Sequence, residues 1–193
     1  MADIYQIDSY DIIDRVSTFG GANLMRASGC SDWDAQYYHQ DQTDYQVEFL
    51  GDRIKIPAGK QLYQSRLDYP NNISLNLDEK VLFSFYIYEN TLTSESTSDK
   101  IRIDYKYFRT GSSTSSATSI DLSYTGLFTQ FWNIGAENIL SFTLGIQIPS
   151  TATGYIIIGP RKVELGNKPT DWSPCPYDLV TYDSTNQALV FFQ

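Results

Sequence analysis

VLFSFYIY, residues 81–88, is the stretch that decides the class of fold. Its side chains alternate with a period of two, which is the signature of a half-buried β-strand. One face of that strand would carry Val81, Phe83, Phe85 and Ile87, and the other Leu82, Ser84, Tyr86 and Tyr88. Aromatic and β-branched residues also favour a pleated sheet, so we predict a strand here.

The same alternation recurs along the chain, and no helical spacing is sustained anywhere. Glycine, proline and asparagine separate the stretches, for example at Gly51, Pro57 and Gly154. Many short strands with polar breaks predict an all-β sandwich or barrel. The other predicted strands are 22–25, 45–50, 53–56, 73–77, 101–108, 139–148 and 155–165.

Charge excludes two classes of partner. The 193 residues carry a formal charge of −9, whereas phosphate recognition needs a face rich in lysine and arginine. We therefore expect no nucleic-acid partner and no anionic membrane surface. Residues 1–15 lack the pattern of a signal peptide, and no apolar run approaches the ~20 residues of a membrane span. We expect synthesis in the cytoplasm without a signal peptide and no membrane insertion.

Three parts follow one another along the chain. Residues 1–20 show little periodicity and end near Gly20-Gly21, so we interpret them as an arm or linker. Residues 21–178 form the predicted domain, and 179–193 form a C-terminal extension with a turn near 183–186. Two Ser/Thr-rich stretches, 91–100 and 109–119, are predicted to be exposed, mobile loops that flank the strand at 101–108.

The segment 155–178, YIIIGPRKVELGNKPTDWSPCPYD, carries a family resemblance. It resembles the closing motif of carbohydrate-binding-like jelly-roll modules in bacteriophage tail fibres, baseplate accessory proteins and prophage minor structural proteins. Asn23-Leu24, Trp33 and the strand at 82–88 are also similar to that family. The matching positions of the closing motif are Lys162, Val163, Glu164, Gly166, Thr170, Asp171, Trp172, Ser173, Pro174, Pro176 and Asp178.

The resemblance implies a jelly-roll β-sandwich of two antiparallel sheets. Its motif residues are mostly structural: Gly166 suits a turn with positive φ, and Trp172 is expected to be a large buried plug. The motif therefore predicts the fold well and the ligand poorly. The predicted core residues are Phe83, Phe85, Phe142, Leu144, Ile156, Ile158 and Trp172.

Saccharide recognition requires aromatic faces for sugar C–H patches and polar groups for hydroxyls. The stretch 32–46, DWDAQYYHQDQTDYQ, supplies both and contains no aliphatic residue except Ala35. We predict that its aromatic side chains are solvent-exposed, with packing beneath the sandwich or against another protein as the alternative. The ligand-binding residues predicted there are Trp33, Gln36, Tyr37, Tyr38, Gln40 and Asp41.

A second predicted surface lies on a sheet face. The tyrosines at 86, 88, 105 and 107 could cover this face, and Trp132 with Gln130 could form its rim. For residues 128–133, packing in the core is the alternative. The ligand-binding residues predicted on this face are Tyr86, Tyr105 and Trp132.

Catalytic and metal motifs are scarce. The single histidine, His39, has no serine or cysteine motif near it, so a hydrolytic triad is not expected. We predict no catalytic residue and no cofactor. A structural calcium ion stays open, with Asp32, Asp34, Glu164 and Asp171 as candidate ligands. Cys30 and Cys175 are interpreted as two reduced thiols, with a bridge between the first and last strands as the alternative.

These observations predict non-catalytic binding of a host cell-wall or surface polysaccharide by a phage tail or baseplate adhesion module. The expected location is the virion, with other phage tail proteins as partners. Two alternatives stay open: a purely structural tail module without a glycan ligand, and a glycan-degrading enzyme. Reducing-sugar release from host walls would reveal the enzyme.

Overall fold

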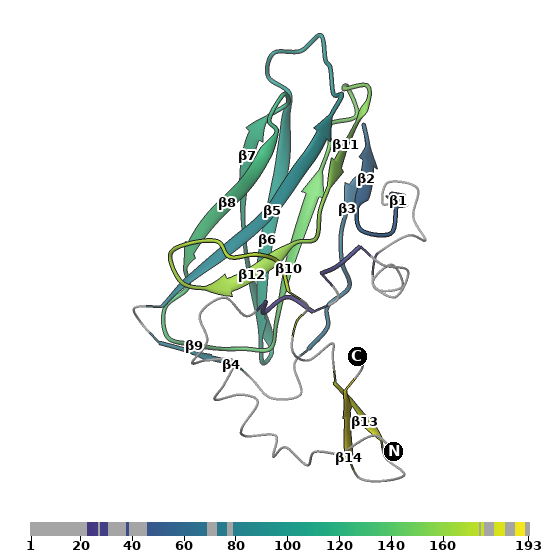
Figure 1. Cartoon of the computed structure of the whole chain (residues 1–193). Helices are drawn as coiled ribbons and strands as arrows, with labels where there is room; N and C mark the ends of the chain where they lie inside the picture. Colours follow the sequence, from purple (N-terminus) through teal and green to yellow (C-terminus); the bar gives the residue numbers. More distant parts are fainter. Residues whose placement is uncertain are drawn as a thin grey trace.

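The computed structural model describes residues 23–26, 28–30, 38, 46–68, 73–76, 79–173, 175, 180–183 and 188–191. This part of the chain is built from strands and connecting loops (Figure 1). It contains no helix, and thus no helix able to cross a membrane. The strands are β1 (Glu48–Phe49), β2 (Ile54–Pro57), β3 (Gln61–Leu62), β4 (Ile73–Leu75), β5 (Lys80–Asn90), β6 (Lys100–Arg109), β7 (Ser112–Asp121), β8 (Gly126–Asn133), β9 (Glu137–Ile139), β10 (Ser141–Gln147), β11 (Tyr155–Ile158), β12 (Lys162–Leu165), β13 (Val180–Asp183) and β14 (Ala188–Phe191).

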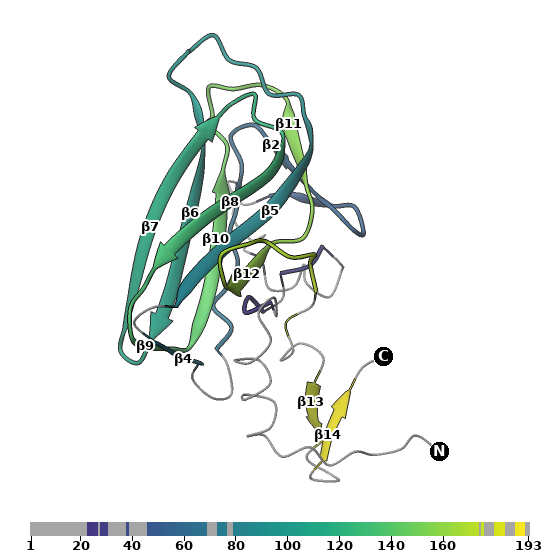
Figure 2. The same ribbon diagram turned by 60° about the vertical axis from the view of Figure 1, so that its left-hand side comes forward.

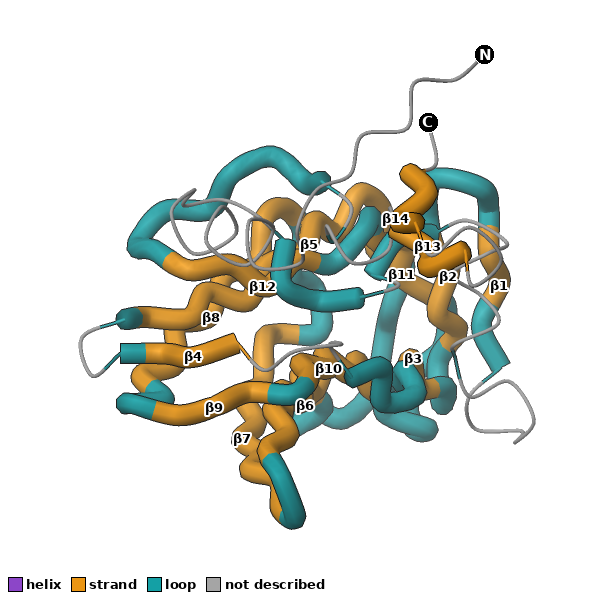
Figure 3. Tube along the Cα trace, turned by 90° about the horizontal axis from the view of Figure 1, so that it is seen from below, coloured by secondary structure: helices purple, strands orange, loops and turns teal. Residues whose placement is uncertain are grey.

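Two large antiparallel sheets form the sandwich, and β4 pairs with β9 in a separate two-stranded sheet. The six-stranded sheet runs β1-β2-β11-β5, with β12 continuing alongside β5 and β8 pairing with β5 as well. The four-stranded sheet runs β3-β10-β6-β7. Figure 3 shows β5, β8 and β12 in one layer and β3, β6 and β10 in the other.

The connections define a jelly roll. The chain changes sheet between β2 and β3, β5 and β6, β7 and β8, and β10 and β11. As a result, β2 lies beside β11 while β3 lies beside β10, and β5 lies beside β8 while β6 lies beside β7. Two such strand pairs folded across two sheets are the jelly-roll topology. The predicted fold class, an all-β jelly-roll sandwich of two antiparallel sheets, is confirmed.

The core lies between the sheets and confirms most of the predicted positions. Those buried as expected are Phe83, Phe85, Phe142, Leu144, Ile156 and Ile158. The prediction for Trp172 is wrong, because its side chain is 40% exposed. Trp172 follows β12 on the outside of the domain, where its indole N–H donates to Oγ of Ser28 at 3.3 Å.

The predicted loop at 109–119 is mostly strand, which corrects the sequence interpretation. Residues 112–121 form β7 and pair with β6 without a register shift. Serine-rich sequence has weak intrinsic strand preference, so neighbouring β6 supplies the backbone partners that the local sequence does not predict. Residues 91–99 do connect β5 and β6 as a loop.

That loop is tied to the β10–β11 connection. The Asp99 carboxylate accepts hydrogen bonds from Ser94 Oγ at 2.5 Å and Thr151 Oγ1 at 2.6 Å. Both hydrogen bonds lower the pKa of Asp99, and the bond from Ser94 has the larger effect. Thr93 and Thr153 exchange backbone hydrogen bonds of 3.1 and 2.9 Å. The loop therefore has fixed attachments at this end of the sandwich.

The chain ends are described in part. The predicted arm, residues 1–20, lies outside the described residues. The predicted turn near 183–186 falls between β13 and β14, which pair antiparallel with each other. At the other end, Leu24 N–H donates to the carbonyl of Val163, which places the first described segment alongside β12.

Candidate functional site

The outer face of the six-stranded sheet is divided into a covered half and an open half. Residues 166–173, here called the closing segment, follow β12 and cross in front of β5 in Figure 1. On this half, Leu82 and Ser84 of β5 face Glu164 and Lys162 of β12, and all four side chains are buried. Farther along β5, Tyr86 and Tyr88 are exposed.

A buried ion pair fastens the closing segment. Lys162 Nζ lies 3.4 Å from Glu164 Oε2, and it donates to the Asp171 carbonyl at 2.7 Å and to Thr170 Oγ1. Glu164 also accepts from Thr170, at 2.9 Å from the backbone N–H and 2.6 Å from the hydroxyl. Each buried charge thus has several partners, as a buried ion pair requires.

These bonds bear on the calcium prediction. The Glu164 carboxylate faces the Lys162 ammonium and both donors of Thr170. Two other candidate ligands, Asp32 and Asp34, lie outside the described residues. Among the residues that are described, no three Asp, Glu, His or Cys side chains gather as metal ligands would. A calcium site stays a prediction.

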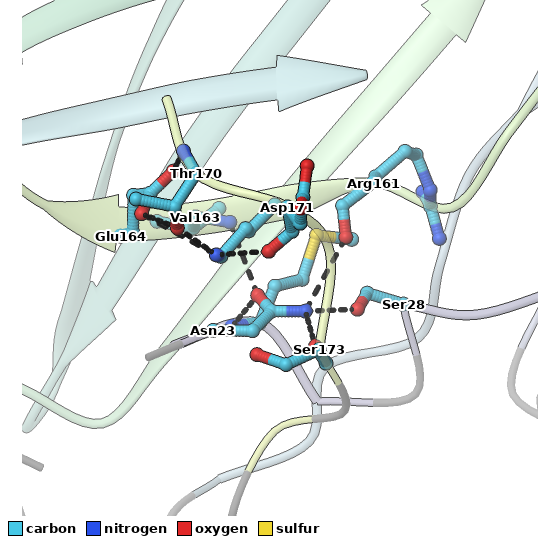
Figure 4. A network of polar contacts seen from close by, with 10 residues as sticks. Asn23, Ser28, Arg161, Val163, Glu164, Thr170, Asp171 and Ser173 are labelled. Carbon is cyan, nitrogen blue, oxygen red and sulfur yellow. Dashed lines mark hydrogen bonds and ion pairs between the residues drawn. The ribbon is translucent and has the colours of Figure 1, made fainter. Parts of the chain in front are cut away.

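Asn23 joins the first segment to the closing segment (Figure 4). Its Nδ2 donates to Ser28 Oγ at 2.6 Å and to the carbonyls of Ser173 at 3.0 Å and Arg161 at 3.4 Å. Its Oδ1 accepts the backbone N–H groups of Met25 at 3.0 Å and Val163 at 3.1 Å. The closing motif is therefore a structural clasp, as the sequence indicates.

The open half carries what we call the tyrosine platform: Tyr86, Tyr88 and Leu127. These side chains are 44%, 50% and 46% exposed. The two tyrosine rings lie 4.7 Å apart between centroids, and Leu127 of β8 is the cross-strand partner of Tyr86. Because the alternate residues Phe85 and Ile87 are buried in the core, strand alternation fixes the platform on the outside.

Charged and polar side chains border the platform. The Arg53 guanidinium carbon lies 4.2 Å from the centroid of the Tyr88 ring, within cation–π range. Tyr155 donates its hydroxyl to Glu89 Oε1 at 2.6 Å, and this hydrogen bond raises the pKa of Tyr155. Lys55 Nζ bonds to Glu48 Oε2 at 3.0 Å, which raises the pKa of Lys55. Near neutral pH, Lys55 is therefore cationic and Tyr155 neutral.

Gly159 lies next to the Tyr88 ring of the platform and leaves room for it. A Cβ atom at this position would lie 2.9 Å from Cε2 of Tyr88, closer than carbon atoms normally approach. The Gly159 N–H also donates to the Tyr86 carbonyl at 2.9 Å. The absence of a side chain at Gly159 therefore lets the Tyr88 ring lie against the backbone.

The structure describes one of the six binding residues predicted in the segment 32–46. Trp33, Gln36, Tyr37, Gln40 and Asp41 lie outside the described residues, as does His39. Tyr38 is buried, so its predicted exposure is wrong. Its ring lies 4.7 Å from the Arg161 guanidinium carbon and 5.1 Å from the Phe49 ring, and it therefore packs as part of the core.

The predicted grouping of Tyr86, Tyr105 and Trp132 on one face is also wrong. Tyr105 is buried and lies on the inner face of the four-stranded sheet. Trp132 is half-buried on the inner face of the other sheet, where its ring lies 5.1 Å from Tyr105 and 6.1 Å from Phe83. Tyr86 points to the opposite side of that sheet, so the structure separates it from the other two.

Sequence reasoning identified Tyr86 and noted Tyr88 but missed Arg53, Leu127 and Glu89. The alternation within 81–88 places both tyrosines on one face. The pairing of β5 with β8 and of β2 with β11 brings Leu127 and Arg53 near them. These are long-range registers, and no local pattern indicates them.

Cys30 and Cys175 are both buried and do not form a disulfide. Each lies two residues beyond a serine of the Asn23 network, Ser28 and Ser173 respectively. The prediction of two thiols agrees with this arrangement.

Comparisons with known proteins find remote structural likeness. No family model matches the chain, and no curated protein matches it significantly. Among solved structures, it is similar to TmCBM61 in complex with β-1,4-galactotriose, with 11% identity, a TM-score of 0.41, and 74% of this chain and 98% of that chain covered. It is similar also to the arabinose-bound α-L-arabinofuranosidase MgGH51, again with 11% identity and a TM-score of 0.41, over 77% of this chain. The chain spans 27% of that enzyme's length.

Proposed function

We propose that the chain is a non-catalytic saccharide-binding module and that the tyrosine platform is its binding surface. The observation that carries the proposal is the pair of adjacent exposed rings, Tyr86 and Tyr88, on the outer face of β5. Neither tyrosine ring packs in the hydrophobic core. Exposed aromatic side chains grouped in this way mark interaction sites.

The chemistry of the platform fits a sugar ring. Tyrosine faces offer stacking to C–H patches, and the tyrosine hydroxyls and Arg53 offer hydrogen bonds to sugar hydroxyls at the edge. Arg53 lies 3.8 Å from Asp52 and Lys55 lies 3.0 Å from Glu48, so both signs of charge occur at the border. Such a mixed border suits a polar ligand of low charge better than a polyanion.

The carboxylates at the border support binding without catalysis. A glycosidase needs an acid and a second carboxylate on opposite sides of the scissile bond. Here Glu89 accepts the Tyr155 hydroxyl, and Glu48 is paired with Lys55. Both groups are thus engaged in positioning neighbours. The two tyrosine side chains are also about half exposed, so a sugar bound on them would stay partly in water, unlike a substrate in an enclosed catalytic site.

The proposed biological setting is adhesion of a bacteriophage tail or baseplate to host surface polysaccharide. The similarity of residues 155–178 to phage tail modules supports this setting. A few stacking contacts give weak affinity per site, about millimolar to micromolar. Many copies in one virion would then raise the effective affinity by multivalency. Mass spectrometry of purified virions tests the location, since absence of the chain from particles contradicts it.

The binding experiment compares wild type with the double variant Tyr86→Ala/Tyr88→Ala on an array of bacterial surface polysaccharides and on isolated cell walls. We expect wild type to bind a subset of glycans and the double variant to lose at least tenfold in affinity. Because both side chains are about half exposed, the melting temperature should change little. Tyr86→Phe should retain most binding, since it keeps the ring.

The matched control is Phe108→Ala, which removes a half-buried aromatic residue from the outer face of the other sheet. It should bind like wild type. Equal loss in Phe108→Ala, or full binding by the double variant, would remove the platform as the site. Release of reducing sugar from cell walls would instead establish the enzyme alternative.

A further inference from the structure

The four-stranded sheet ends in an edge strand, β7. β7 pairs with β6 residue for residue, from Arg109 opposite Ser112 to Lys100 opposite Asp121. On its other side, no strand from the described part of the chain pairs with β7. Apart from its pairing with β6, the backbone hydrogen bond that reaches β7 from the described residues is the turn bond from Tyr124 N–H to the carbonyl of Asp121, at the last residue of the strand. Figure 2 shows β7 as the outermost strand of the sandwich.

The features that normally protect such an edge are missing from β7. Its sequence is SSTSSATSID, with one charged residue at the end, no proline and no lysine, and its register has no bulge. Edge strands usually carry such devices because an open edge recruits another strand. By contrast, the opposite edge of the same sheet is formed by β3, which is two residues long.

The side chains of β7 are compatible with self-pairing. A twofold axis perpendicular to the sheet, at Ser116 or Ala117, would place residues of equal parity opposite one another. Centred on Ala117, the register sets Asp121 opposite Ser113; centred on Ser116, it sets Thr114 opposite Thr118. In both registers no charge faces a like charge, and hydroxyl side chains face each other, which favours cross-strand pairing.

We propose that β7 is a homotypic interface, at which the strand pairs antiparallel with β7 of a second copy of this chain. The contact would join the two four-stranded sheets into one continuous sheet. It would leave the tyrosine platform uncovered, because the platform lies on the outer face of the other sheet. A single pair of strands buries less than a standard interface, so the dimer is weak and concentration-dependent.

The test is sedimentation equilibrium of the full chain over a wide concentration range. Wild type should pass from monomer to dimer. Ala117→Lys places two lysines at or beside the twofold axis, and it should lower the association constant at least about tenfold. Because Ala117 is exposed and its cross-strand neighbour is Asp104, the fold should accept the lysine. Ala136→Lys, at an exposed position outside β7, between β8 and β9, is the matched control.

Cross-linking gives an independent measurement. Ala117→Cys tests the register centred on Ala117, and Ser116→Cys tests the register centred on Ser116. In one of these two variants, oxidised glutathione should produce a disulfide-linked dimer, since facing residues of an antiparallel pair are close enough to bridge. Ala136→Cys should not. A wild type that is monomeric at every concentration overturns the proposal. So does a dimer that persists in Ala117→Lys, or that Ala136→Lys weakens equally.

Discussion

Asn23 accepts the backbone N–H of Val163 through its side-chain oxygen at 3.1 Å, although 140 positions separate the two residues. The amide nitrogen of the same side chain donates to Ser28 and to the carbonyl of Ser173. One buried amide therefore fastens the first described segment to β12 and to the closing segment. Its polar atoms take the place of water as hydrogen-bond partners for polar groups in three parts of the chain.

Asn23→Ala should therefore lower the free energy of unfolding by roughly 2–3 kcal/mol, because it leaves buried donors and acceptors without partners. Urea denaturation measures the change. Asn138→Ala is the control, since Asn138 is exposed and accepts a single hydrogen bond from Ser74. That variant should change stability by less than about 0.5 kcal/mol. Equal effects in the two variants would contradict a structural role for the Asn23 network.

Trp172→Ala should cost about 1–2 kcal/mol, because 40% of the side chain is already exposed in the folded protein. Phe142→Ala, which empties a buried site, should cost about 3–5 kcal/mol. Thermal and chemical denaturation of both variants give the comparison. A loss for Trp172→Ala as large as that for Phe142→Ala would mean that the tryptophan is a core residue after all.

Asp99→Asn should destabilise the protein at neutral pH and have less effect in acid. The hydrogen bonds from Ser94 and Thr151 lower the pKa of the carboxyl in the folded state. Their stabilising contribution is fully present above the ordinary pKa of aspartate and is lost as pH falls through the lowered value. The melting temperatures of wild type and variant should therefore begin to converge as the pH falls below the ordinary aspartate value of about 3.9, and should meet only below the lowered value. A constant difference across pH 2–7 would contradict this.

Gly159→Ala should weaken saccharide binding without unfolding the domain. The new methyl group would meet the Tyr88 ring, and the ring, at the end of an exposed side chain, can move away. Binding to the glycan selected by wild type should fall several-fold while the melting temperature stays close to wild type. Gly166→Ala is not a suitable control because its φ of 130° favours glycine. Ala136→Gly serves instead.

Much of the fold follows from local patterns. The alternation in 81–88 and 101–108 predicts both the strands and their buried faces, since Ile101, Ile103, Tyr105 and Tyr107 are all buried. β7 could not be predicted in this way, because a row of serines and threonines has no apolar period. Its strand structure depends on β6, which is a tertiary effect.

The site was less predictable than the fold. Aromatic composition suggested that Tyr38 is exposed, but its side chain is buried, with its ring 4.7 Å from the guanidinium carbon of the buried Arg161. Tyr86 and Tyr105 looked equivalent in their strands, yet the jelly roll puts them in different sheets. Which face of a strand meets water depends on the partner sheet and on the closing segment, and neither is encoded locally.

The Asn23 network also implies a delay during synthesis on the ribosome, between the first segment and its bonding partner. Its carbonyl partner Ser173 lies 150 positions downstream, and translation proceeds at about 5–20 residues per second. The first segment must therefore wait about 7–30 s after its own synthesis before its partner exists. During that interval Leu24 and Met25, both destined for the core, have no native neighbours along β12. Chaperones that shield apolar segments of nascent chains would find their target there.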